Sequence, residues 1–508
     1  MMQLLRRHRL SAIPTEAMLR VAIWSAFLVI VTFTSADPDL WGHVRFGADM
    51  LRSGSIQQVD TYSFASDRPW VNHEWAAEIL AAWAFNTLGS AGLVGLKLLI
   101  VGPVLLLLNA TLRKEGVQSG FARDVTVGIA IAITLSQAHH VRPQLFSLLF
   151  FSILFASLLA ARRGAQRWLF VLPPLFAAWA NLHGGWIVGG GVVVLWTAAL
   201  MMSGDRREAL GLMATGALSA VATVATPFGF GLWRFLWETV GFSRPEIIEW
   251  QPIYFTGWSF VVLWLIAFTV MTLGVVLGGR EKFRVERLVV GLALAVASVK
   301  VARLLAFFGL ASVFLFAPLL CEAYQRRRTV RQFRGTPLVR LGFAGVACAL
   351  AMFTIGVIYK NVGHVRLDAT SLPEPESVAV LNQQSAGRRV LVWFSWGEYA
   401  IWHLSPRMQV SIDGRRETVY SDTVATRHFD FYYDRRDGAT LPRDLRADYI
   451  WVPRILPAVP RLRTDSRWTL IYEGDQSVIF ERSDLSPHRQ STAVAAMAAT
   501  TPRFFPGP

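Results

Sequence analysis

Apolar residues fill most of the first 360 positions of the chain, in runs long enough to cross a bilayer. A transmembrane α-helix needs about 20 such residues. The windows of this kind predict about eleven helices, and their centres fall roughly at residues 27, 101, 131, 152, 174, 195, 217, 269, 293, 312 and 349. The pattern therefore indicates a mainly α fold class: a polytopic transmembrane helical bundle over residues 1–360.

The polar segments between these windows alternate in character. One set is basic, and the positive-inside rule makes it cytoplasmic; it comprises the N-terminus and the loops at 113–123, 162–167, 206–207, 280–287 and 326–340. The other set is rich in Trp, Asp, Glu, His and Gly, and we expect it on the extracytoplasmic face. An odd number of spans then places the N-terminus inside and the C-terminus outside.

The first external loop covers residues 36–90. Its second half, 73–88, has apolar residues in helical phase with polar ones, which predicts an amphipathic helix at the membrane interface. The entry turn of the second span is the alternative interpretation. The N-terminal arginines and the apolar run that ends at Ala36 also leave a second interpretation open, a signal peptide cleaved after Ala36.

Beyond residue 360 the composition changes to that of a small soluble α/β domain, residues 361–485, predicted to be extracytoplasmic. Its predicted strands are 389–394, 408–412 and 447–452, and 468–481 is typical of a hairpin around Gly474-Asp475. The tail, 486–508, is rich in Ala, Thr and Pro, and we expect it to be disordered.

The composition supports a membrane protein. Hydrophobic residues make up 53% of the chain and charged residues 17%, so a soluble globule would lack the interior to bury its apolar surface. The net charge of +15 would suggest nucleic acid in a soluble protein. Here the cations cluster in short loops, so we expect the lipid bilayer as partner and no nucleic acid. Two cysteines, Cys321 and Cys348, provide no disulfide framework.

Two carboxylates open the first external loop. In an extended turn, Asp37 and Asp39 point to the same side, and Pro38 restricts the backbone between them. Such a pair is suited to hold a divalent cation, Mg²⁺ or Mn²⁺, or to supply a general base. The alternative is a helix N-cap, because Asp39 precedes a helical pattern over 40–51.

Three cations run against the positive-inside trend because they fall in short external loops: Arg142, Lys300 and Arg303. Lys300 and Arg303 lie in a break within an apolar stretch and are three positions apart, so we expect them to share a helix face. Cations at this level bind a lipid-linked phosphate. The alternative is that they reach to lipid headgroups.

Histidines are concentrated in the same external loops: His43, His73, His139, His140 and His183. None has a strong zinc spacing, so we expect hydrogen-bonding roles, with His43 and His183 in substrate binding. In the soluble domain, the aromatic stretch 393–399 precedes Arg415 and Arg416. Aromatic rings beside arginines suit a sugar or phosphate surface, and a domain core is the alternative.

With these motifs assembled, the chain resembles the GT-C superfamily of membrane glycosyltransferases, which includes protein O-mannosyltransferases, lipid A aminoarabinose transferases and the catalytic subunit of oligosaccharyltransferase. The motifs that carry the resemblance are Asp37-Pro38-Asp39-Leu40-Trp41-Gly42-His43, the interfacial stretch 72–88, Arg142-Pro143-Gln144 and Asn181-Leu182-His183-Gly184-Gly185. The likeness covers most of the chain in order and topology, and only the first loop is specific.

The resemblance implies a hexosyl- or pentosyltransferase that uses a polyprenyl-phosphate-linked sugar donor and an extracytoplasmic acceptor: a lipid, a glycan or a protein. It implies that a first-loop acid, Asp37 or Asp39, acts as the base or holds the metal. The mannosyltransferases pair Asp with an adjacent Glu, whereas Pro38 separates two Asp here, so which carboxylate is the base stays open. It further implies a multi-pass protein of a bacterial plasma membrane. The alternatives are a flippase for lipid-linked saccharides and a non-catalytic assembly protein.

Overall fold

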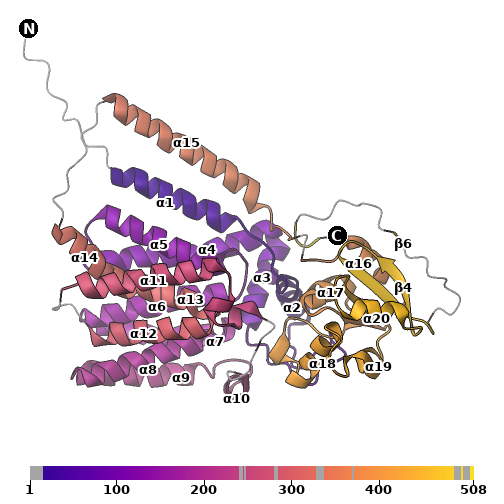
Figure 1. Ribbon diagram of the computed structural model, residues 1–508. Coiled ribbons are helices and arrows are strands. Elements are labelled where there is room, and N and C mark those ends of the chain that lie inside the picture. Colours follow the sequence, from indigo (N-terminus) through magenta and orange to yellow (C-terminus); the bar gives the residue numbers. More distant parts are fainter. Residues whose placement is uncertain are drawn as a thin grey trace, which may run out of the picture.

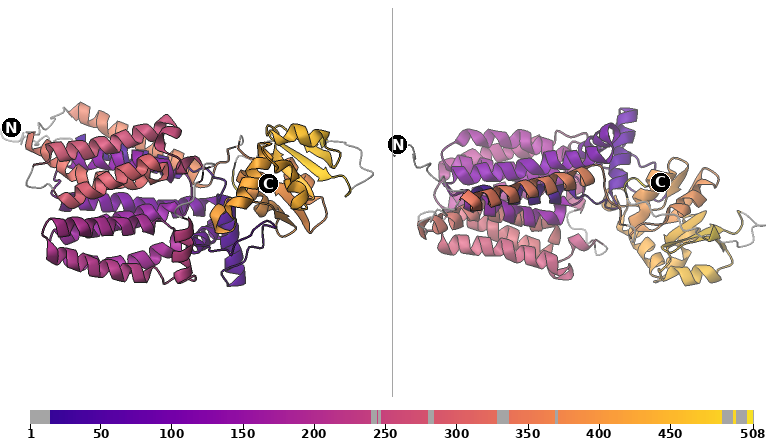
Figure 2. Two further views of the ribbon diagram at one scale, coloured as in Figure 1. Left: turned by 60° about the horizontal axis from the view of Figure 1, so that its bottom comes forward. Right: turned by 90° about the horizontal axis from the view of Figure 1, so that it is seen from above.

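The computed structural model describes residues 15–239, 244, 247–279, 284–327, 337–368, 371–485, 494–495 and 504–507. It consists of a long helical region with a smaller α/β domain at one end (Figure 1). Two further views confirm this arrangement, and they place the first-loop helices α2 (Leu40–Ser53) and α3 (Trp75–Leu88) at the junction (Figure 2). The chain is therefore elongated, and the first loop lies where the two parts meet.

Helices cover each of the eleven expected centres. In chain order they are α1 (Thr15–Thr32), α4 (Ser90–Lys114), α5 (Gly120–Ala138), α6 (Gln144–Arg162), α7 (Leu172–Leu182), α8 (Trp186–Met202), α9 (Arg206–Ala222), α11 (Trp258–Leu277), α12 (Val285–Lys300), α13 with α14 (Leu305–Ala311, Ala317–Arg327) and α15 (Pro337–Val362). Among the described helices, five are long and apolar enough to cross a membrane by length and composition. The polytopic helical fold class is confirmed, while the number of spans stays a prediction.

The helices differ in how deeply they lie in the bundle. In the segment Ala302–Arg326, 89% of the most apolar window is buried, and it holds a π-helical turn at Ser312–Phe316. Aromatic rings pack around it, with Phe307 against Phe151 and Phe314 against Phe155. By contrast, α15 lies along α1 at the edge of the bundle, and only 6% of its window is buried (Figure 1). Such an apolar and exposed helix is suited to face lipid.

The first loop folds into two helices, α2 (Leu40–Ser53) and α3 (Trp75–Leu88), which pack against each other. Gly47 permits the close approach, because a Cβ there would overlap the backbone of Glu78 in α3. Gly54 ends α2 in the left-handed conformation, at φ 64°, which glycine adopts without strain. The helix expected over 73–88 is thus present.

The C-terminal domain is built on a mixed sheet in the order β2-β1-β3-β5-β4-β6. Its strands are β1 (Arg388–Val392), β2 (Met408–Val410), β3 (Tyr449–Pro453), β4 (Trp468–Glu473), β5 (Ser477–Arg482) and β6 (Val494–Ala495). β1 pairs in parallel with β2 and β3, and β4 with β5 forms the expected hairpin. The helices are α16 (Pro375–Asn382), α17 (Gly397–Leu404), α18 (Asp422–Tyr432), α19 (Leu441–Asp444) and α20 (Ala458–Thr464). The predicted α/β unit is confirmed.

The expected disorder of the tail is wrong for residues 504–507. Phe505 is only 4% exposed and packs against Trp41, Phe85 and Trp402. The Trp41 indole N–H donates a hydrogen bond to the Pro506 carbonyl at 2.8 Å. The Ala-, Thr- and Pro-rich composition of the tail gave no sign that Phe505 packs on the first loop. Most of the remaining tail lies outside the described residues.

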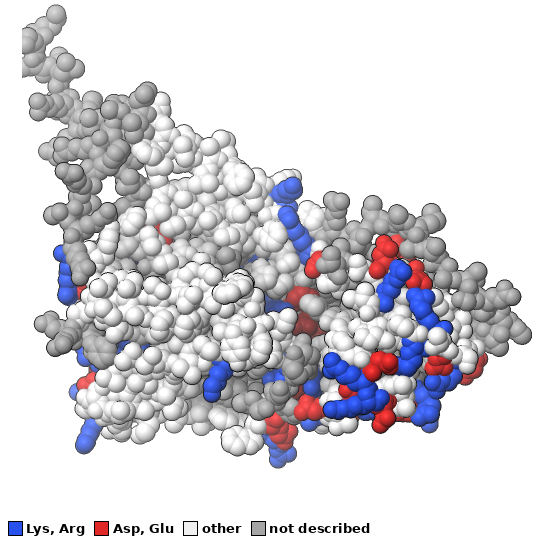
Figure 3. Space-filling model, viewed as in Figure 1, with Lys and Arg blue, Asp and Glu red and all other residues white. Residues whose placement is uncertain are grey.

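Charge is distributed unevenly over the molecule. In the face shown in Figure 3, the surface of the helical region is largely uncharged, whereas charged side chains gather over the C-terminal domain and at the far end of the bundle. A broad uncharged belt between two charged ends is what a bilayer requires of a spanning protein.

Candidate active site

The two first-loop carboxylates follow directly after α1, in an extended segment fixed by backbone pairing. Ala36 N–H donates to the Arg366 carbonyl at 2.8 Å, and Arg366 N–H donates to the Thr34 carbonyl at 2.8 Å. Arg366 follows α15, so the last helix of the bundle holds the first loop in place. This pairing positions Asp37 and Asp39 at the end of the bundle that faces the C-terminal domain.

Asp37 is buried, with 3% of its surface exposed, and forms an ion pair with Arg142. Arg142 also reaches Glu249, with Nη1 and Oε2 3.2 Å apart. The second Asp37 oxygen, Oδ1, is buried without a hydrogen-bond partner among the described residues. Asp37 thus neutralises and orients Arg142, and it is poorly placed to meet an acceptor from solvent.

Asp39 is partly exposed, and its carboxylate has no hydrogen-bond or ion-pair partner among the described side chains. It occupies the N-cap position of α2 but makes no side-chain capping bond, so capping does not explain it. Its pKa is raised to about 6, chiefly by burial; Glu249 and Glu74 contribute to the rise, while His43 and Arg303 oppose it. An unpartnered carboxylate with this pKa has the properties of a general base.

Two arginines converge on Glu249, in the 3₁₀ turn Ile248–Trp250. Arg303 Nη1 lies 2.9 Å from Glu249 Oε1, and Arg142 binds the other oxygen. Burial would raise the pKa of Glu249, but the two guanidinium groups outweigh burial and hold that pKa below its usual value. With Asp37, which pairs with Arg142, the cluster near Asp39 consists of two arginines and two carboxylates, Asp37 and Glu249.

Lys300 does not share a helix face with Arg303, contrary to expectation. α12 ends at Lys300, Val301 is extended, and Arg303 lies in a separate 3₁₀ turn, Ala302–Leu304. The break turns Arg303 toward Glu249 and leaves Lys300 exposed, with no described ion-pair partner. The three-residue spacing of the two cations predicts a shared helix face only where the helix continues, and here the helix ends before Arg303. The expectation that Lys300 binds substrate stays a prediction.

His43 lies one turn along α2 from Asp39 and contacts α3. Its Nδ1 is 3.4 Å from Glu78 Oε1, and Asn72 donates to the other Glu78 oxygen at 2.6 Å. Burial lowers the pKa of His43, but Glu78, Glu74 and Asp39 together raise it to about 8. His43 is therefore an imidazolium at neutral pH, and its charge favours the ionised form of Asp39.

His183 begins the turn between α7 and α8 and is buried. Its Nδ1 accepts from Gly185 N–H at 3.0 Å and lies 2.6 Å from the Ser147 hydroxyl. These contacts make Nδ1 the acceptor, so the proton is on Nε2, which points to Glu74 Oε1 at 3.7 Å. Burial lowers the pKa of His183 to about 3, so it stays neutral. His183 orients Glu74, and no described contact brings it against Asp39.

The C-terminal domain contributes a carboxylate, Glu398, that the sequence did not single out for chemistry. Its Oε2 accepts from Gly42 N–H at 3.1 Å, in the first turn of α2. A Cβ on Gly414 would overlap Asp39 Oδ1 and lie 3.0 Å from Glu398 Oε1, so Gly414 packs against both carboxylates. Burial and the nearby Asp39 and Asp413 raise the pKa of Glu398 well above its usual value. Glu398 and Gly414 form the wall of the site on the side of the C-terminal domain.

Three acidic residues of the site were therefore missed: Glu74, Glu249 and Glu398. Glu249 had a local signal, because it precedes Trp250 in an external loop and two cations fall in other loops of the same face. Glu74 follows His73 at the start of the predicted interfacial helix, and no motif of that stretch marks its carboxylate for chemistry. Glu398 had no such signal, since its partner Gly42 lies 356 positions away.

The donor set does not fit a preformed metal site. In the described part of the chain, no group of three or more His, Cys, Asp or Glu side chains is arranged to hold a metal ion. Asp37 already pairs with Arg142, so a metal ion held by both first-loop carboxylates would compete with that arginine. The expected Mg²⁺ or Mn²⁺ at Asp37 and Asp39 stays a prediction, which an activity assay after chelation and metal return checks.

No protein-family model matches the chain, and no curated protein matches it. Solved structures do. The archaeal oligosaccharyltransferase AglB from Archaeoglobus fulgidus, in complex with an inhibitory peptide and a dolichol-phosphate, has a TM-score of 0.55 at 12% identity, over 86% of this chain and 69% of AglB. ArnT from Cupriavidus metallidurans in the apo state has a TM-score of 0.55 at 12% identity, over 91% of this chain and 97% of ArnT.

The same ArnT bound to undecaprenyl phosphate has a TM-score of 0.53 at 13% identity, over 92% of this chain and 97% of ArnT. The mycobacterial arabinofuranosyltransferase AftD has a TM-score of 0.50 at 13% identity, over 91% of this chain and 41% of AftD. The chain has the fold of these proteins. The resemblance drawn from the first loop is thus confirmed at the level of the fold.

Proposed function

We propose that the chain is a membrane glycosyltransferase that moves a sugar from a polyprenyl-phosphate donor to an extracytoplasmic acceptor. The observation that carries the proposal is Asp39. It is an unpartnered, partly exposed carboxylate with a pKa of about 6, and the charge of Arg303 acts on it. Arg303 binds Glu249, which also binds Arg142. A base beside a phosphate-binding cluster is what sugar transfer from a lipid phosphate requires.

The donor assignment is supported by the surroundings of Arg142. Beside Arg142 and His43 lies a narrow hollow of about 20 Å³, which the apolar side chains of α3, α4 and α6 line: Ala77, Ala81, Leu96, Ile100, Leu145 and Phe146. Cations at the edge of an apolar bundle match a charged phosphate on a hydrocarbon chain. Of the proteins with this fold, AglB is in complex with a dolichol-phosphate and ArnT is bound to undecaprenyl phosphate.

In the proposed reaction, an acceptor hydroxyl attacks the anomeric carbon of the donor sugar while Asp39 takes the hydroxyl proton. The bond from the anomeric carbon to the phosphate oxygen breaks, and the electron pair leaves with the polyprenyl phosphate. Arg303 and Arg142 stabilise the charge that develops on that phosphate. Asp37 holds Arg142 in position, and His43 keeps Asp39 ionised. The basic loops at the opposite end of the bundle support an extracytoplasmic location for this chemistry.

The test is complementation with single-residue variants. The gene is deleted in its host, surface glycans and glycolipids are profiled by mass spectrometry, and the gene is restored as wild type, Asp39→Asn or Asp37→Asn. We expect Asp39→Asn to abolish restoration of the missing glycan, because the amide cannot accept the proton. Asp37→Asn should lower it less, about 10- to 100-fold, because Arg142 loses its counterion but remains present.

The matched control is Asp475→Asn, which removes an exposed carboxylate in the turn of the β4–β5 hairpin. It should restore the glycan fully at the same membrane level. Full restoration by Asp39→Asn would contradict the role of this residue as base. Full restoration by both first-loop variants would favour a flippase or an assembly protein over an enzyme.

A further inference from the structure

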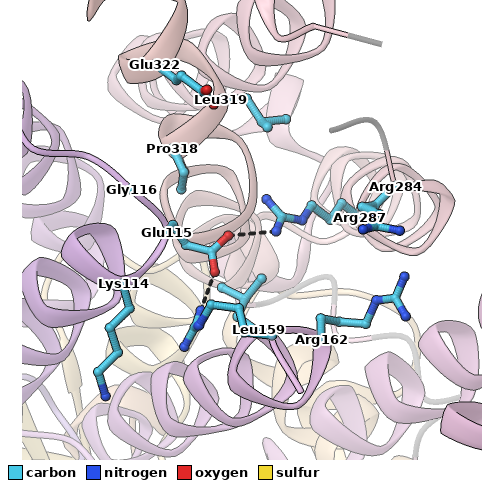
Figure 4. Close-up of a pocket in the computed structure, with 11 residues that line it drawn as sticks. Lys114, Glu115, Gly116, Leu159, Arg162, Arg284, Arg287, Pro318, Leu319 and Glu322 are labelled. Atoms are coloured by element: carbon cyan, nitrogen blue, oxygen red, sulfur yellow. Dashed lines mark hydrogen bonds and ion pairs between the residues drawn. The ribbon is translucent and has the colours of Figure 1, made fainter. Parts of the chain in front are cut away.

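A cavity lies at the end of the bundle opposite the candidate active site. α4 begins at Ser90, whose hydroxyl donates to the Phe505 carbonyl near the C-terminal domain, and ends 25 residues later at Lys114. That length is about 37 Å of helix. The cavity beside Lys114 has a volume of about 320 Å³ and lies between the ends of α4, α6, α12 and α14 (Figure 4). The cavity is therefore remote from Asp39 and separate from the candidate active site.

Cations line most of this cavity: Lys114, Arg162, Arg163, Arg284 and Arg287. Only two carboxylates join them, Glu115 and Glu322. Leu159, Pro318 and Leu319 supply an apolar wall. The cavity therefore offers positive charge next to hydrocarbon.

The carboxylates do not cancel the positive charge. Glu115 is shared by Arg163 and by Arg287, whose Nη2 is 2.8 Å from Glu115 Oε2. Glu322 binds Arg326 at 3.0 Å, outside the cavity lining. The pairs around Glu115 thus carry a net charge of +1, with Arg287 well buried.

Arg162 is the exception, because carboxylates surround it. It lies 3.0 Å from Asp205 and 2.9 Å from Glu286, and it also pairs with Glu208. These three carboxylates more than neutralise the positive charge of Arg162. The side of the cavity formed by Arg162 is therefore acidic overall, and an anion would bind on the opposite side.

Lys114 and Arg284 form that other side. Both are exposed, and neither has a carboxylate partner among the described residues. The Lys114 ammonium lies 5.7 Å from the centre of the Trp168 ring. Lys114 is the last residue of α4. Trp168 is an exposed aromatic side chain in the 3₁₀ helix Gln166–Val171, between α6 and α7. A Trp beside a Lys at helix ends is typical of the headgroup level of a bilayer.

We propose that this cavity binds a phosphate-bearing anion, and that its source is the headgroup of an anionic phospholipid. Basic pockets between transmembrane helices bind such headgroups. The volume is at the lower end of the range for small-molecule sites, about 300–1,000 Å³, so one headgroup fits. Lys114 and Arg284 contact the phosphate, and the wall formed by Leu159 and Leu319 meets the start of the acyl chains.

The experiment uses the purified full-length protein in detergent, titrated with phosphatidylglycerol or phosphatidylcholine and followed by native mass spectrometry. We expect phosphatidylglycerol to bind more tightly than phosphatidylcholine. In the double variant Lys114→Ala with Arg284→Ala, its affinity should fall on the order of tenfold or more, because two surface cations are lost. Inorganic phosphate is the competitor that separates a lipid from a soluble ligand.

The matched control is Arg113→Ala, which removes an exposed cation from the same turn of α4 but does not line the cavity. It should bind phosphatidylglycerol as wild type does. If the double variant does not fold, Lys114→Gln with Arg284→Gln replaces it. Equal lipid binding by wild type and variant would overturn the proposal, as would an equal loss in Arg113→Ala. Saturable phosphate binding without any lipid preference, lost in the double variant, would support the phosphate site and overturn the lipid as its source.

Discussion

Asp37 and Asp39 differ by two positions in the sequence, and the fold gives them different partners. Asp37 is buried against Arg142, while Asp39 lies beside His43, Gly414 and Arg303 with its carboxylate unpaired. The sequence could predict that one of the pair acts in chemistry, but not which one. The choice depends on Arg142, which approaches from a loop 105 positions away.

The pH dependence of transfer follows from two neighbouring groups. Asp39 must be deprotonated to act as base, so kcat/KM should rise as pH increases through about 6. His43 carries its charge up to about pH 8. Above that pH Asp39 stays ionised, but His43 no longer offers a positive charge to the donor phosphate, so the rate should fall. We expect a bell-shaped profile with limbs near pH 6 and pH 8.

The profile is measured with the acceptor that complementation identifies, and the variant His43→Gln assigns its limbs. This variant should remove the alkaline limb and shift the acid limb upward, because the positive charge of His43 lowers the pKa of Asp39. His364→Gln, at a half-buried histidine after α15, is the control and should leave both limbs unchanged. An acid limb at about pH 4 would indicate an ordinary carboxyl group and argue against Asp39 as the base.

At the scale of elements, α2 connects the site to the C-terminal domain. It carries His43 toward α3, and its first turn presents Gly42 N–H to Glu398 in α17. Its inner face buries Leu40, Trp41, Val44 and Phe46. The helix therefore sets the distance between Asp39 and the wall that the domain provides.

Gly42→Ala tests this contact. A Cβ at position 42 would overlap Glu398 Oε2 and lie 2.8 Å from the Phe46 ring, so α2 and α17 must separate. Overpacking of this kind costs about 1–3 kcal/mol. We expect a lower melting temperature in detergent and a transfer rate reduced at least tenfold, since the wall moves away from Asp39.

The control for this substitution is Gly102→Ala, a glycine within α4 where a Cβ meets open space. It should change neither the melting temperature nor the rate. A Gly42→Ala protein with wild-type stability and rate would show that α2 and α17 can separate without cost.

At the scale of the whole molecule, the local parts could be predicted and the assembled site could not. Periodicity and turn residues indicated the helices and the hairpin at Gly474-Asp475, because those signals lie within a few residues of each other. The expectation that Lys300 and Arg303 share a helix face was wrong, because Val301 adopts an extended conformation. No Pro or Gly in the sequence marks that position. Glu398 and Phe505 reach the first loop from more than 350 positions away, through packing that has no local signature.

The C-terminal domain is joined to the first loop by a buried arginine. Arg415 binds Asp413 through Nη2 at 2.7 Å and Asp60 through Nη1 at 2.8 Å, and its side chain is 6% exposed. The guanidinium lies over the rings of Phe46, 4.8 Å from its centre, and Trp70, 4.6 Å away. The interpretation of Arg415 as part of a sugar-binding surface is therefore wrong, because its donors are used inside the junction.

Arg415→Met should detach the domain from the first loop. The substitution leaves Asp60 and Asp413 buried without a cation, which costs about 3–5 kcal/mol. We expect faster protease cleavage between the two parts, a lower melting temperature and loss of transfer. Arg467→Met removes an exposed arginine that pairs only locally with Asp465, and it should behave as wild type. The triple variant Asp60→Asn, Asp413→Asn and Arg415→Met should recover part of the protease resistance, because no unpaired charge remains buried. If Arg415→Met resists protease as wild type does, the domain is held by the apolar contacts of α2 and Phe505 rather than by this ion pair.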